Sequence, residues 1–113
     1  MKVLVHTDRN IHADASEVRR IEDDLTNALE RFTEDLTRVE VHLSDESAGT
    51  STDEDIACLL EARPAGRDPV TVSHQAATLA ESLAGATRKL KALLTHTFDR
   101  LAEKDERDTI RRH

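Results

Sequence analysis

Basic side chains gather on one flank of a long amphipathic segment near the C-terminus. At about 100° per residue of an α-helix, Lys89, His96 and Arg100 fall within about 40° of one another. Arg88 and Lys91 lie on the solvent side of the same segment, one on each flank of its apolar seam. A Lys or Arg placed against a phosphate releases condensed counterions, and Arg can hold a phosphate with two donors at once. This pattern suits sequence-independent contact with a nucleic acid, although an ordinary solvated helix face has the same pattern.

Charge is unevenly distributed along the chain, which has 113 residues and a formal net charge of −7. Residues 78–104 contain five basic and three acidic residues, which gives this segment a net charge of +2. Residues 14–36 contain eight acidic residues and only three basic ones, Arg19, Arg20 and Arg31. A strongly acidic protein is repelled by nucleic acid overall, so an RNA partner requires a local cationic patch. The later segment is therefore the better candidate for phosphate contact, and the three arginines are secondary candidates.

The other reactive side chains do not form a recognisable catalytic or metal motif. His6, His42 and His74 fall on predicted strands, and three imidazoles are able to bind zinc. No His-x-x-x-His spacing or cysteine pair supports a metal site, so we expect histidines on a sheet surface and no metal. The lone Cys58 allows no internal disulfide, is typical of a reducing compartment, and is expected to be a buried apolar residue. Since there is also no phosphate-binding glycine loop and no nucleophile–base pair, we expect no catalytic residue, no cofactor and no small-molecule substrate.

Alternating and helical periodicities define the elements that must position these side chains. Val39, Val41 and Leu43 alternate with Glu40 and His42, which is the period of a half-buried strand. In chain order, the predicted elements are a strand over residues 2–7, a helix over 14–34, strands over 37–44, 56–63 and 69–74, and a helix over 78–104. The polar, acidic segment 44–55 is predicted to be a loop.

Both predicted helices carry start signals. Asp14 is a candidate N-cap with Glu17 three residues later, and Ser16 is an alternative cap. Thr78 and Glu81 form the T-x-x-E capping box of the last helix. Apolar residues then recur at three- and four-residue steps in each helix. We expect the last helix to end near Lys104, because the following residues are almost all polar.

The order of elements predicts the fold class. A strand, a helix and a second strand form a βαβ unit, so the first two strands should be parallel, and short links favour antiparallel pairing of the others. The result is an α+β fold: a two-layer β-α-β-β-β-α sandwich, with a four-stranded mixed sheet and both helices on one face. We expect one domain over residues 1–104 and a charged tail over 105–113. No apolar run is long enough for a signal peptide or a membrane span, so we expect a cytoplasmic protein without a membrane partner.

Several stretches resemble the family of ribosome hibernation-promoting factors and ribosome-associated inhibitors. They are residues 38–46 (RVEVHLSDE), 58–63 (CLLEAR) and 70–79 (VTVSHQAATL), the Leu83-x-Gly85-Ala86 step and residues 88–90 (RKL). The resemblance extends over about residues 2–102, and it depends on the order of elements and the joint between the last strand and the last helix.

The resemblance implies a partner and a mode of action. Members of the family sit between the ribosomal subunits on the small subunit, overlap the paths of mRNA and tRNA, and silence ribosomes in slow growth or stress. Their helices contact rRNA phosphates through Lys and Arg. Carried over to this sequence, the contacts to 16S rRNA would be made by Arg88, Lys89, Lys91 and Arg100, with Arg19, Arg20 and Arg31 as secondary contacts. The alternative, motivated by the negative net charge, is the same fold without ribosome binding, acting as an acidic protein-interaction module.

Overall fold

The structure of the protein is a computed structural model that describes the backbone of residues 1–46 and 55–111 and the side chains of residues 1–46 and 55–100. Its elements are β1 (Lys2–Thr7), α1 (Ala15–Ala28), a short 3₁₀ helix (Glu30–Phe32), β2 (Leu36–Asp45), β3 (Ile56–Pro64), β4 (Val70–Ala76) and α2 (Leu79–Arg111). The order is the predicted one. Most of the predicted loop 44–55 lies outside the described residues.

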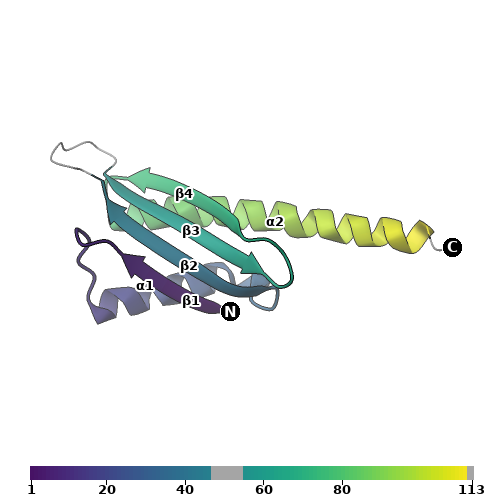
Figure 1. Cartoon of the computed structure of the whole chain (residues 1–113), viewed down its shortest axis with the longest axis horizontal. Helices are drawn as coiled ribbons and strands as arrows, with labels where there is room; N and C mark the ends of the chain where they lie inside the picture. The colour runs from purple at the N-terminus through teal and green to yellow at the C-terminus, as the bar shows by residue number, and fades with distance from the viewer. Residues whose placement is uncertain (47–54, 112–113) are drawn as a thin grey trace.

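The four strands form one mixed sheet in the order β1-β2-β3-β4. β1 and β2 are parallel, with Val3 opposite Val39, whereas the β2–β3 and β3–β4 pairs are antiparallel. Both helices cover the same face of the sheet (Figure 1). The predicted two-layer α+β sandwich is therefore confirmed, and it leaves the other face of the sheet open.

Capping confirms the predicted helix starts, but both helix ends differ from the prediction. The backbone N–H of Glu17 donates to Asp14 Oδ1 at 2.8 Å, and that of Glu81 donates to Thr78 Oγ1 at 3.1 Å. α1 ends at Ala28, because Leu29 leaves helical geometry (φ −102°, ψ 18°) and the chain continues as a 3₁₀ turn. The predicted end of the last helix near 104 is wrong, since α2 continues to residue 111. No Gly or Pro occurs between residues 86 and 111 to stop it.

An aliphatic core lies between the sheet and the helices. Alternate residues of β2 and β3 point into it, and Val39, Val41 and Leu60 are completely buried. The helices contribute the apolar stripes predicted from their periodicity, including Leu25 of α1 and Leu90 of α2. The core contains Ile21, Leu25, Leu29, Phe32, Leu36, Val39, Val41, Leu43, Cys58, Leu60, Ala62, Leu83, Ala86, Leu90 and Leu94.

Two residues of this inner face, Cys58 and His74, differ in chemistry from the aliphatic side chains around them. Cys58 is fully buried, as predicted, and the burial raises the pKa of its thiol to about 12. His74 of β4 also faces the helix layer, against Gly85 of α2. A Cβ at position 85 would overlap the imidazole, since even Cγ of His74 would be only 2.5 Å away. A glycine is thus required where α2 crosses β4.

Candidate nucleic-acid interface

A shallow open groove runs between α1 and α2, and three of the predicted cations line it. Arg20 comes from α1, and Arg88 and Lys91 come from α2. Apolar side chains such as Ile21 and Leu83 lie in the same groove. All three cations are exposed, so the groove presents their charges to solvent above an apolar floor.

The groove was not foreseen from the sequence. Arg88 and Lys91 were expected on opposite flanks of the seam, but both line this groove, and Arg88 also lines a second hollow beside β4. The expectation of opposite flanks is therefore wrong, because α1 packs close enough to α2 to share the solvent side with it. Glu17 and Asp24 of α1 line the groove as well, so its potential is mixed rather than purely positive.

The cations of the groove are not neutralised by ion pairs. Among the side chains of residues 1–46 and 55–100, the ion pairs join His6 to Glu40, Arg38 to Glu40, and Arg63 to Glu61, all on the sheet. No carboxylate of these residues lies within 4.0 Å of a charged nitrogen of the groove. Three positive charges are therefore free to meet a phosphate.

The remaining predicted cations lie outside the groove. Lys89 reaches the edge strand β4, where its Nζ donates to the backbone oxygen of Ser73 at 2.8 Å. The guanidinium of Arg31 lies 4.9 Å from the centre of the Phe32 ring, which stacks on Phe98. Arg19 and Arg100 are exposed on α1 and α2, respectively. The seven candidates thus form one cluster of three and four separate positions, not one continuous ridge.

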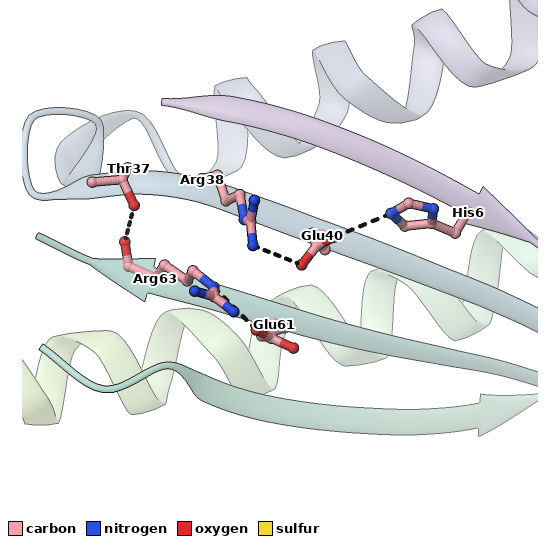
Figure 2. Close-up of polar contacts among 6 residues, drawn as sticks. All are labelled: His6, Thr37, Arg38, Glu40, Glu61 and Arg63. Atoms are coloured by element: carbon pink, nitrogen blue, oxygen red, sulfur yellow. Dashed lines mark hydrogen bonds and ion pairs between the residues drawn. The ribbon is translucent and has the colours of Figure 1, made fainter.

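A row of three cations on the open face of the sheet was not foreseen from the sequence. Lys2, Arg38 and Arg63 lie side by side across β1, β2 and β3 in the strand register. Arg38 is 3.6 Å from Glu40, and Arg63 is 3.3 Å from Glu61, so two of these three charges are paired (Figure 2). The alternation within each strand predicts that these residues lie on the open face, but their alignment in one row depends on the register between the strands.

His6 and His42 lie next to each other on the same open face. Their rings stack with centroids 4.7 Å apart, and His6 Nε2 lies 3.2 Å from Glu40 Oε1 (Figure 2). Burial by itself would raise the pKa of Glu40, but the His6 hydrogen bond and the charges of Arg38, His6 and His42 lower it overall. The prediction of surface histidines is confirmed for His6 and His42. It is wrong for His74, which faces the helix layer and shares its strand face with Val72, a partly buried residue packed against the core.

Comparison with known proteins identifies the family. Residues 4–102 match the family described as sigma 54 modulation protein / S30EA ribosomal protein. The chain belongs to this family. S30EA proteins are ribosome-associated modulators and not enzymes, which agrees with the lack of a catalytic motif in the sequence.

Solved structures of this fold agree with the family match. The N-terminal domain of Protein Y from Thermus thermophilus superposes with a TM-score of 0.66 at 16% identity, covering 86% of this chain and 99% of that domain. A ribosomal subunit interface protein from Coxiella burnetii gives a TM-score of 0.65 at 8% identity, covering 88% and 99%. Among curated proteins, none matches the sequence significantly. Within the described part of the chain, no helix is both long and apolar enough to cross a membrane.

Proposed function

We propose that this S30EA protein binds the small ribosomal subunit through phosphates of 16S rRNA and silences ribosomes under stress or slow growth. It acts by occupancy, without making or breaking a bond. The observation that carries the proposal is the groove between α1 and α2, where Arg20, Arg88 and Lys91 converge without ion-pair partners among the described residues. The name of the Coxiella burnetii relative, a ribosomal subunit interface protein, supports the ribosome as partner.

The physical basis is counterion release from RNA. Each cation that neutralises a phosphate lowers the slope of log K against log salt by about 0.7 to 0.9. Three groove cations therefore account for a slope of about −2 to −3. Lys89, Arg100, Arg19 and Arg31 are proposed as further contacts. Glu17 and Asp24 repel phosphate from part of the groove, so they restrict the orientations in which RNA can enter it.

Co-sedimentation of the purified protein with purified small subunits tests the proposal. Wild type is expected to sediment with the subunit at about 50 mM salt and to dissociate progressively towards about 200 mM. The variant Arg20→Glu/Arg88→Glu/Lys91→Glu should bind more weakly and with a flatter salt dependence. The control Lys2→Glu/Arg9→Glu/Arg67→Glu makes the same change in net charge at exposed positions outside the groove, and it should lose much less affinity.

Two results would contradict this assignment in different ways. If wild type stays at the top of the gradient at low salt, the protein does not bind the subunit. If the protein then retains bound proteins after nuclease treatment, the result would favour an acidic protein-interaction module, which the net charge of −7 suggests. If the groove variant and the control lose affinity equally, binding depends on overall charge, and the groove is not the contact surface.

A further inference from the structure

The open face of the sheet holds three metal-ligating side chains in one cluster. His6 of β1 and His42 of β2 are directly opposite in the parallel register, and Glu40 lies two residues before His42 on the same face of the same strand. Potential ligand atoms of the three residues all lie within 4.8 Å of one another. The strand period of two and the register of β1 on β2 therefore place the three side chains together.

The donor set is one that zinc prefers. Imidazole nitrogens and a carboxylate oxygen bind Zn²⁺ at about 2.0–2.2 Å, which places neighbouring ligand atoms of a tetrahedral site about 3.3 Å apart. His6 Nε2 and Glu40 Oε1 are already 3.2 Å apart. The His42 ring is exposed and stacks on His6, with a ligand atom within 4.8 Å of those of His6 and Glu40, so its side chain is free to change rotamer on metal binding.

The neighbouring charges are compatible with a cation at this point. Arg38 contacts Glu40 through Oε2, which leaves Oε1 directed to His6 (Figure 2). A carboxylate that ligates a metal with one oxygen commonly accepts a hydrogen bond on the other, and Arg38 is placed for that role. Asp8, Glu46 and Lys89 line the same hollow as the two histidines, so two carboxylates and one ammonium group surround it.

We propose that His6, Glu40 and His42 together bind one Zn²⁺ ion, or a divalent ion of similar ligand preference, on the open face of the sheet. Three protein ligands leave at least one coordination position for water or for a ligand from a partner. Bound zinc adds two positive charges to the face opposite the helices. The site does not depend on the proposed rRNA contact, since it lies on the other side of the sheet from the α1–α2 groove.

Calorimetric titration with Zn²⁺ alone, on the full chain without a polyhistidine tag, tests the site. Wild type is expected to bind one ion per chain. His6→Gln/His42→Gln and the single variant Glu40→Gln should each bind at least about tenfold more weakly. The matched control His12→Gln/His96→Gln removes two exposed histidines elsewhere and should bind as wild type does.

A second measurement uses wild type alone and therefore tests the site even if the variants fail to fold. In NMR spectra of wild type, Zn²⁺ should shift the imidazole resonances of His6 and His42 and leave unchanged that of His74, which packs against Gly85. Absence of wild-type binding, loss of affinity in the control as large as in the site variants, or shifts confined to other histidines would each overturn the proposal.

Discussion

The contact between Gly85 and His74 should reverse the usual effect of a glycine-to-alanine substitution in a helix. Gly85 lies inside α2, where replacement by alanine at an unobstructed position stabilises a helix by about 1 kcal/mol. Here the added Cβ would overlap three ring atoms of His74, including Cγ close to the backbone. Because Cγ cannot move without rotation of the whole side chain, the ring has to leave its position on the inner face of β4.

The size of the effect follows from two opposing terms. Overpacking of this kind costs about 1–3 kcal/mol, so Gly85→Ala in wild type should lower the free energy of unfolding by roughly 0–2 kcal/mol after the helix gain is subtracted. In a His74→Ala background the imidazole is absent, and Gly85→Ala should raise the free energy of unfolding by about 1 kcal/mol. The double-mutant cycle should therefore give a coupling energy of about 1–3 kcal/mol.

Urea unfolding followed by circular dichroism at equilibrium measures all four proteins of the cycle. A change of 1 kcal/mol moves the midpoint by about 0.3–1 M, given a typical m of about 1–3 kcal/mol/M. Gly66→Ala is the control: Gly66 has φ of 70°, but its added Cβ meets nothing within 4 Å, so its cost should be the same with and without His74. If Gly85→Ala is equally stabilising in both backgrounds, the explanation of the glycine is refuted.

Three further outcomes follow from the core, the caps and the buried thiol. Leu90→Ala removes a fully buried side chain beneath α2 and should cost about 2–5 kcal/mol in urea unfolding, whereas exposed Ala92→Ser should cost little. Asp14→Ala removes the acceptor for the Glu17 N–H and should lower the free energy of unfolding by about 1 kcal/mol. Asp14→Ser keeps a side-chain oxygen at this position and should largely restore that stability. Burial raises the pKa of Cys58 from 9.0 to about 12, so between these pH values the folded chain retains a proton that the unfolded chain has lost. Stability should then fall with rising pH by about 1.4 kcal/mol per pH unit in wild type but not in Cys58→Ala, and a thiol reagent should react with Cys58 only as fast as the protein opens.

The fold was predictable because its signals are local. The alternation of Val39, Val41 and Leu43 identifies the inner face of β2, and side-chain oxygens at Asp14 and Thr78 mark the helix starts. Each of these features depends on residues a few positions apart. Helix ends were less predictable: the chain leaves α1 at Leu29 and continues as a 3₁₀ turn that carries the buried Phe32, and no Gly or Pro near this point signals the change.

The candidate site was only partly predictable, because it combines residues from two helices. Periodicity identified Arg88 and Lys91 as solvent-facing, but their proximity to Arg20 depends on the distance between α1 and α2. The inward position of His74 did have a sequence signal, since it lies two residues after Val72 on the same strand face. The His6–His42 pair required the register of parallel strands, which no short segment specifies.

The two faces of the sandwich differ in how their cations are compensated, and this difference addresses the problem posed by the negative net charge. On the open face, Arg38 and Arg63 each have a carboxylate partner, which leaves Lys2 as the member of the row of three cations without an ion-pair partner among the described residues. In the groove, Arg20, Arg88 and Lys91 have none among the described side chains, although acidic residues are abundant on α1. Long-range repulsion between protein and RNA is largely screened beyond about 8–10 Å at moderate salt, whereas direct contacts with a phosphate are screened less. An acidic protein can therefore bind rRNA if its unpaired cations contact the phosphates, and the α1–α2 groove brings three such cations together.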